Sequence, residues 1–187
     1  MWSIDEIQKT WHLAAKLHHG QIYKDSAEGG GMAYLFHIGS VTFEMMTAVV
    51  KEPELNADLA IKCAILHDTI EDTSIDFHEV QNLFGEEVAH GVMALSKNEE
   101  LETKREMMED SLQRIKQQPK EVWAVKMADR ICNLYLHPHH WSKEKIIKYR
   151  EEALFIHHEL KEGSPYLADR LYTRILAYTA FIENSQS

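Results

Sequence analysis

The sequence has few cysteines and no long apolar run. Its two cysteines, Cys63 and Cys132, both lie within apolar helical patterns, which predicts buried reduced thiols rather than a disulfide framework. No stretch approaches the roughly 20 apolar residues of a membrane helix, and residues 1–6 lack the basic start and apolar core of a signal peptide. We therefore expect a cytoplasmic protein that does not associate with membranes.

Positive charge is also scarce. The chain has 20 lysines and arginines against 30 aspartates and glutamates, so its net charge is −10 with histidine taken as neutral. This balance argues against a DNA- or RNA-binding protein, because binding a nucleic-acid polymer requires clustered positive charge. A small anionic substrate fits the sequence, since a metal ion and a few lysines can make a positive pocket on an acidic protein.

Alternating strand patterns are absent from the sequence, whereas apolar residues recur at helical spacing along its whole length. A chain of 187 residues fits one domain, and a domain of this size buries roughly 70% of its unfolded surface. The last helix is predicted from about residue 165 to residue 183. We therefore expect an all-α protein with a single domain over residues 1–187.

Several polar residues stand where helices are expected to begin. Asn56 and Ser142 are suited to cap the helices that follow them. Ser3 and Glu6 match the spacing of a capping box, in which each side chain bonds the backbone amide of the other residue. These residues predict helix starts near residues 3, 56 and 142.

A histidine and three carboxylates follow the apolar run at residues 59–66. If the helix continues, His67 and Glu71 share a face; if it unwinds, Asp68 and Asp72 can turn toward one place. An exposed acidic residue at a helix C-terminus is destabilised by roughly 0.3–1 kcal/mol through its interaction with the helix macrodipole. A bound cation would offset this cost and explain why the acidic residues stand there. The alternative is an ordinary helix end with a solvated acidic turn.

A further carboxylate, Asp129, lies in the middle of an apolar stretch. Burying a carboxylate is costly unless it is paired or bound to a metal. Its neighbour Arg130 points about 100° away on a helix, whereas Asn133 lies one turn on and shares its face. We therefore interpret Asp129 and Asn133 as part of a site.

The order of these residues resembles a known family. His37, His67-Asp68 and Asp129 resemble the metal-binding signature of the HD-domain phosphohydrolases. The segment His67-Asp68-Thr69-Ile70-Glu71-Asp72-Thr73 is similar to the hydrolase domain of the RelA/SpoT alarmone enzymes and their small Mesh1-type relatives. Flanking motifs match in order and approximate spacing over about residues 3–160: His18-x-x-Gln21-x-x-Lys24-Asp25, Tyr34-x-x-His37, Phe84-Gly85, Lys126-x-Ala128-Asp129-Arg130-x-x-Asn133 and Trp141-Ser142-x-x-Lys145-x-x-x-Tyr149.

The resemblance implies a helical HD-domain bundle that uses manganese to remove pyrophosphate from the 3′ position of a guanosine tetra- or pentaphosphate, (p)ppGpp. It implies that Glu71 and Asp72 position and deprotonate the attacking water. Two imidazoles and two carboxylates would leave open positions on a divalent ion for water and a phosphoryl oxygen. The implied metal ligands are His37, His67, Asp68 and Asp129, and the implied phosphate and ribose contacts are Lys24, Asn133, Lys145 and Tyr149, with Lys97 a further candidate for phosphate.

The chain departs from the family where the base is expected to bind. The family has Arg-Lys where this chain has Tyr23-Lys24, and the family's arginine stacks on guanine. A tyrosine ring also stacks on a purine, but it lacks the charge and the donors of a guanidinium. We therefore expect a purine nucleotide as substrate, with guanine, adenine or another purine as its base.

Two other functions stay open. Other HD families include nucleotidases that cut 5′-monophosphates, and such an enzyme would release orthophosphate rather than pyrophosphate. A catalytically inactive nucleotide-binding module is the third interpretation. The presence of both Glu71 and Asp72 argues against it, because an inactive module could readily lose them.

Overall fold

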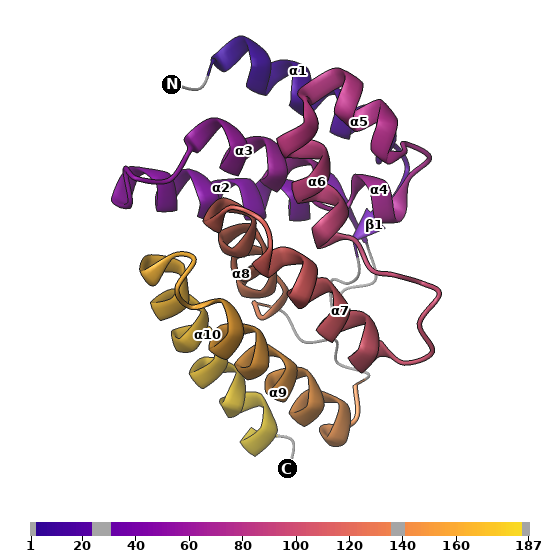
Figure 1. Ribbon diagram of the computed structural model, residues 1–187. Helices are drawn as coiled ribbons and strands as arrows, with labels where there is room; N and C mark the ends of the chain where they lie inside the picture. The colour runs from indigo at the N-terminus through magenta and orange to yellow at the C-terminus, as the bar shows by residue number, and fades with distance from the viewer. Residues whose placement is uncertain (1–2, 24–30, 136–140, 185–187) are drawn as a thin grey trace.

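A computed structural model describes residues 3–23, 31–135 and 141–184 and is built almost entirely from helices (Figure 1). The predicted all-α class is confirmed. The helices are α1 (Ile4–Leu17), α2 (Leu35–Lys51), α3 (Ala57–Leu66), α4 (Thr69–Asp72), α5 (Phe77–Phe84), α6 (Glu86–Leu95), α7 (Lys104–Lys116), α8 (Lys120–Asn133), α9 (Lys143–Leu160) and α10 (Pro165–Asn184).

One small sheet was not predicted. The strands β1 (Ile22–Tyr23) and β2 (Met32–Ala33) pair antiparallel, with Ile22 opposite Ala33. Strands of two residues are too short to produce an alternating pattern in the sequence. The pair is nevertheless important, because β1 ends on Tyr23 and β2 leads directly into α2.

Two of the three predicted helix caps are confirmed. The Asn56 side chain accepts hydrogen bonds from the amides of Asp58 and Leu59, and Ser142 Oγ accepts one from the amide of Lys145. The capping box at Ser3 is wrong, because the Ser3 side chain makes no capping hydrogen bond. Ser3 is exposed, so water can solvate the first amides of α1 in its place.

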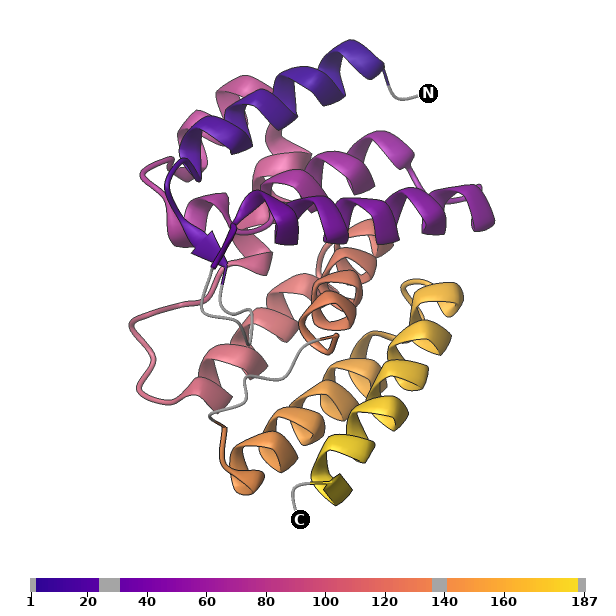
Figure 2. The ribbon, with the colours of Figure 1, turned by 180° about the vertical axis from the view of Figure 1, so that it is seen from behind.

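Helices α3 and α8 form the centre of the molecule. Every residue of α3 from Leu59 to Leu66 is buried, including Lys62, whose ammonium reaches Asp58 at 2.8 Å while its aliphatic stem stays in the core. Helix α8 packs against α2, α3, α6, α7, α9 and α10. Figure 2 shows α8 between the layer of α1, α2 and α3 and the pair formed by α9 and α10. Side chains near the C-terminal end of α8 are therefore held by several elements at once.

None of the helices that the structure describes is both long enough and apolar enough to cross a bilayer.

Candidate metal centre and active site

The helical conformation is interrupted between α3 and α4, and this break sets the directions of the His67, Asp68, Glu71 and Asp72 side chains. Helix α3 ends at Leu66, and α4 begins at Thr69 after Asp68, whose backbone (φ −103°, ψ 0°) leaves the helical region. The Thr69 hydroxyl donates to the Leu66 carbonyl at 2.7 Å and stabilises the turn. Because the helix does not continue, His67 and Glu71 do not share a face, and that alternative is wrong. Asp68 and Asp72 instead turn toward the same tyrosine hydroxyl.

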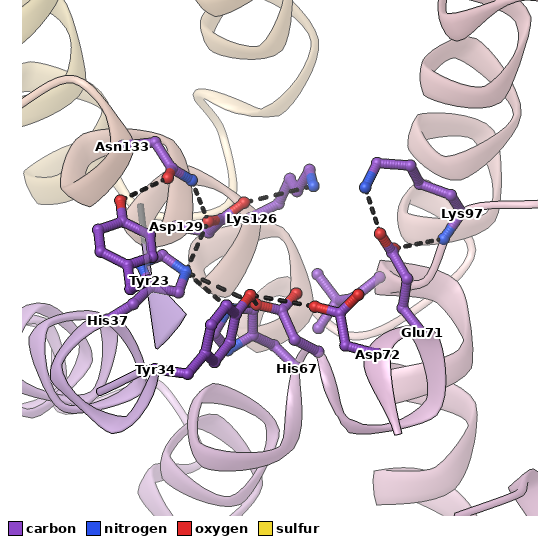
Figure 3. Close-up of a pocket in the computed structure, with 12 residues that line it drawn as sticks. Tyr23, Tyr34, His37, His67, Glu71, Asp72, Lys97, Lys126, Asp129 and Asn133 are labelled. Carbon is purple, nitrogen blue, oxygen red and sulfur yellow. Dashed lines mark hydrogen bonds and ion pairs between the residues drawn. The ribbon is translucent and has the colours of Figure 1, made fainter. Parts of the chain in front are cut away.

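Two histidines and two aspartates converge beside this break, and Figure 3 labels His37, His67 and Asp129 of this cluster. His67 Nε2 lies 3.3 Å from His37 Nε2 on α2. Asp68 Oδ2 lies 2.9 Å from His67 Nε2, and Asp129 Oδ1 on α8 lies 3.3 Å from His37 Nε2. Ligand atoms of His37, His67 and Asp129 all lie within 4.8 Å of one another. The structure thus brings together four residues from three separate parts of the chain.

The orientation of the imidazoles fits a cation between them. His67 Nδ1 lies 2.8 Å from the Ala64 carbonyl, which can only accept, so Nδ1 carries a proton and Nε2 faces the cluster. Without an ion, one of the two Nε2 atoms, which lie 3.3 Å apart, must carry a proton to avoid repulsion, and a bound cation would take the place of that proton. Burial lowers the pKa of His67, but Asp68 and Asp129 outweigh burial and raise the pKa to about 9. A donor set of two imidazoles and two carboxylates suits a divalent transition-metal ion.

The two carboxylates of the cluster stay charged although they are enclosed. Burial raises the pKa of Asp68, yet His67 more than offsets it and holds the pKa well below its usual range. Burial also raises the pKa of Asp129, but Lys126 and the two imidazoles outweigh burial and hold this pKa well below its usual range. Asn133 Nδ2 donates to Asp129 Oδ1 at 2.5 Å, which agrees with the expectation that the two share a face of α8.

Tyr34 connects the cluster to Asp72, a role that was not predicted from the sequence. Its hydroxyl donates to Asp68 Oδ2 at 2.6 Å and lies 3.1 Å from Asp72 Oδ2, so one proton serves both carboxylates. Burial and the nearby Asp68 raise the pKa of the Tyr34 hydroxyl far above its usual value, and the hydroxyl therefore remains a donor. A signal was present in the motif Tyr34-x-x-His37, whose spacing puts both side chains one helical turn apart.

A second set of contacts holds the Tyr34 ring in place. The His18 ring stacks on it with centroids 4.9 Å apart and an angle of 16° between the planes. His18 Nδ1 contacts Gln21 Oε1 at 2.6 Å, and Gln21 Nε2 donates to the Asp72 carbonyl at 2.7 Å. The end of α1 is therefore tied to both the tyrosine and the end of α4.

Glu71 points to a different partner. Its carboxylate accepts a hydrogen bond from the Lys97 backbone amide at 2.8 Å and forms a salt bridge with the Lys97 ammonium. Burial lowers the pKa of Lys97, but Glu71 more than compensates and raises it. In Figure 3 this pair lies on the far side of Asp72 from His37. Glu71 thus fixes Lys97 at the edge of the cavity that holds the cluster.

Only some of the residues expected to contact the substrate line the cavity beside the cluster. Tyr23 stacks on the His37 ring at 4.8 Å with an angle of 6°, and its hydroxyl donates to Asn133 Oδ1 at 2.9 Å. A cavity of about 200 Å³ is lined by Tyr23, Lys97 and Asn133 along with the cluster. Tyr149 lines a neighbouring cavity. The Lys145 ammonium lies 4.1 Å from the centre of the Trp141 ring, and Lys24 lies outside the described residues.

Comparisons with known proteins agree with this geometry. A family model described as "HD domain" matches residues 10–163. The chain is 34% identical over 167 residues to a GTP pyrophosphokinase of Myxococcus xanthus, covering 82% of this chain but 20% of that protein. It is 30% identical over 149 residues to the guanosine-3′,5′-bis(diphosphate) 3′-pyrophosphohydrolase MESH1 of Danio rerio, covering 78% of each.

The fold is also found among solved structures. A structure reported under the heading "A metazoan ortholog of SpoT hydrolyzes ppGpp and plays a role in starvation responses" superposes with a TM-score of 0.78 at 24% identity. The match covers 95% of this chain and 97% of that one. The matched residues include the whole His and Asp cluster, and the chain belongs to the HD domain family.

Proposed function

We propose that this chain is a metal-dependent phosphohydrolase that removes pyrophosphate from the 3′ position of a purine alarmone of the (p)ppGpp type. The observation that carries the proposal is the Tyr34 hydroxyl, which joins the His and Asp cluster to Asp72. The activity printed for the Danio rerio relative supports it, because that protein is of similar length and matches over 78% of its chain.

His37, His67, Asp68 and Asp129 would hold the ion, and we propose manganese. When bound, a divalent ion acidifies water and withdraws charge from a phosphoryl group. The protein's part is to fix the ligands from three helices and to keep His67 in the tautomer that faces the cluster.

Asp72 is the residue that we assign to deprotonation of the attacking water. It lies next to the cluster through Tyr34, and it lines the same cavity. Partial burial and the negative charge of Asp68 raise its pKa, although the Tyr34 hydrogen bond works against this. A general base is most effective when its pKa approaches the working pH, so the direction of the shift favours this role.

We assign Glu71 the role of positioning Lys97 rather than that of deprotonating water. Because its carboxylate is engaged by Lys97, it orients the Lys97 ammonium at the cavity. There the lysine can offset the charge of a phosphate group, as a charge-assisted hydrogen bond does.

Tyr23 lies at the boundary between the metal cavity and a neighbouring cavity that could hold a purine base. Beside it lies a second cavity of about 530 Å³, mostly apolar and sharing Tyr23 and His37 with the first. Phe36 and Phe43 line this apolar cavity and are 55% and 68% exposed. Aromatic walls bind a purine by stacking, which discriminates poorly between bases. We therefore propose that the base lies here and that guanine and adenine are both accepted.

The test is to incubate the protein with manganese and a panel of guanine and adenine nucleotides that carry a 3′-diphosphate. We expect pyrophosphate release from at least one member, and Asp72→Asn to lower kcat by about 100-fold or more through loss of the general base. Asp169→Asn, which removes the same charge from an exposed position on α10, serves as the matched control.

Each other outcome has a defined meaning. If no member of the panel releases pyrophosphate, the proposed function is wrong. Release of orthophosphate from 5′-monophosphates would identify the nucleotidase alternative. Unchanged turnover in Asp72→Asn would refute the assignment of the base.

A further inference from the structure

The two imidazoles of the cluster are held in different ways. A histidine that binds a metal usually donates its second ring N–H to a carbonyl or carboxylate oxygen, which fixes the orientation of the ring. His67 has such a contact, because its Nδ1 lies 2.8 Å from the Ala64 carbonyl. His37 Nδ1 is buried and has no hydrogen-bond partner among the described residues. Within this part of the chain, the orientation of the His37 ring therefore depends on other contacts.

The Tyr23 ring covers one face of the His37 imidazole. The two centroids lie 4.8 Å apart, and the angle between the planes is 6°. Tyr34 and His67 meet the same imidazole at steep angles, with 70° and 65° between the planes. A rotation of the imidazole out of its plane would drive its atoms into the parallel tyrosine ring, and packed interiors have no room for this. Tyr23 therefore opposes the rotation that an Nδ1 hydrogen bond would normally prevent.

The Tyr23 hydroxyl leads to a second proposed ligand. It donates to Asn133 Oδ1 at 2.9 Å, and Asn133 Nδ2 donates to Asp129 Oδ1 at 2.5 Å (Figure 3). Burial and the nearby Asp129 raise the pKa of Tyr23, so the hydroxyl remains a donor. The same Asp129 oxygen lies 3.3 Å from His37 Nε2. Tyr23 thus touches one proposed ligand directly and reaches another through a single amide.

The backbone of Tyr23 is fixed by the small sheet. Tyr23 lies opposite Met32 in the pairing of β1 with β2. A Cβ atom at Gly31 would overlap the Ile22 side chain, so glycine is what permits the close approach of the chain at this point. Since β2 leads directly into α2, the same hairpin places both the tyrosine ring and His37. The contact between the two rings is therefore built into the local fold.

We propose that Tyr23 is a positioning residue of the metal centre, whose ring holds His37 and whose hydroxyl orients Asp129 through Asn133. Ligands that are already held in place lose less conformational freedom when an ion binds, and this raises the affinity for the ion. The role is additional to any contact between Tyr23 and a purine. It rests on the metal ligands of the proposed function and is independent of the substrate.

The test is calorimetric titration of the purified protein with Mn²⁺ in the absence of nucleotide. Tyr23→Phe keeps the ring and removes the hydroxyl, so we expect Mn²⁺ binding to weaken about fivefold, the scale of one net hydrogen bond. Tyr23→Leu removes both contacts and should weaken binding by about 10–100-fold, as changes behind metal ligands do. Phenylalanine should thus recover part of the loss that leucine causes. Circular dichroism establishes that each variant is folded.

A double-mutant cycle separates this role from a general effect on packing. Asn133→Ala should weaken Mn²⁺ binding by about tenfold, because Asp129 loses its donor. Adding Tyr23→Phe to Asn133→Ala should weaken it further by less than about twofold, because the hydroxyl acts only through that amide. Losses that multiply in full would show that the two residues act independently, and they would overturn the inference.

Tyr172→Phe is the matched control, since it removes a hydroxyl from a tyrosine on α10 that is 46% exposed. It should bind Mn²⁺ as the wild-type protein does. Unchanged affinity in Tyr23→Phe or in Tyr23→Leu would overturn the inference, and so would a wild-type protein that does not bind Mn²⁺. Because these titrations need no hydrolysis, a protein that shows the expected Mn²⁺ affinities but releases no pyrophosphate would contradict the proposed function alone.

Discussion

A single hydroxyl group lies between two carboxylates with different proposed tasks. Asp68 belongs to the proposed metal ligands and Asp72 is the proposed base, and the Tyr34 hydroxyl contacts both. Two carboxylates so close repel each other, and a shared donor reduces that repulsion while fixing their relative position. Tyr34 therefore acts as a positioning residue in the proposed mechanism.

Replacing Tyr34 with phenylalanine should lower kcat by about tenfold with KM changed less than twofold, because one hydrogen bond that positions Asp72 is lost. The stacking of the ring on His18 is kept, so the protein should remain folded. Steady-state kinetics on the alarmone substrate measures the effect. Tyr172→Phe, at a position 46% exposed, is the control, and an unchanged kcat in Tyr34→Phe would contradict the positioning role.

The sequence predicted the residues of the cluster better than their partners. His37, His67, Asp68 and Asp129 were identified through the resemblance, and the structure brings them together. The pairing of Glu71 with Lys97 carries no local signal, because these residues lie far apart in the chain and meet only through tertiary packing. The side-chain direction of Asp72 likewise depends on the turn between α3 and α4, which residue spacing alone left as one of two alternatives.

Close helix packing explains one glycine in a helix interior. Gly91 lies in α6, and a Cβ atom there would stand 2.8 Å from Cys63 Sγ on α3 and 3.0 Å from Val122 Cγ2 on α8. Both neighbours are buried, so neither can move away without disturbing the core. Gly91 thus sets the distance between three helices.

Gly91→Ala should destabilise the protein by about 1–3 kcal/mol despite the better helix propensity of alanine, since the overpacking exceeds that gain. Gly39→Ala is the matched comparison, because a Cβ there would first meet Trp11 at an ordinary 3.6 Å. It should be neutral or stabilising by up to about 1 kcal/mol. Urea unfolding followed by circular dichroism measures both, and equal stabilities of the two variants would refute the packing argument.

Elements with strong local signals were predicted, and those without were not. Apolar residues in helical patterns and the caps at Asn56 and Ser142 predicted α3 and α9, because these signals act within one or two turns. The helix break at Asp68 was left as one of two alternatives, and the pairing of β1 with β2 was not predicted. Residue spacing alone cannot choose between the two conformations at Asp68, and strands of two residues are too short to leave a pattern in the sequence.

The proposed metal ligands come from two layers of the molecule that pack against each other. His37 comes from α2, His67 and Asp68 follow α3, and Asp129 comes from α8. An ion held by all four would link the N-terminal helices to the central helix. The cavities around the cluster also arise only where these layers meet, which is why the sequence indicated the cluster but not the cavities.

Adding manganese at about 100 times its dissociation constant should stabilise the folded protein by about 2.7 kcal/mol. For a chain of this size, that corresponds to a rise in Tm of roughly 5–10 °C. His37→Ala should abolish the rise, and a chelator should reverse it in the wild-type protein. His158→Ala, whose side chain is 75% exposed, is the control, and an undiminished rise in His37→Ala would contradict the ligand assignment.

The position of Asp129 on α8 also has a kinetic consequence for maturation. A chain in which α8 has not yet docked offers His37, His67 and Asp68 without Asp129, and these three ligands hold a divalent ion more weakly than the complete set of four. Contacts between distant segments form late, because the intervening chain must first be ordered. Metal uptake by the refolding protein is therefore expected to follow tertiary assembly, so its rate reports the docking of α8 rather than the encounter with the ion.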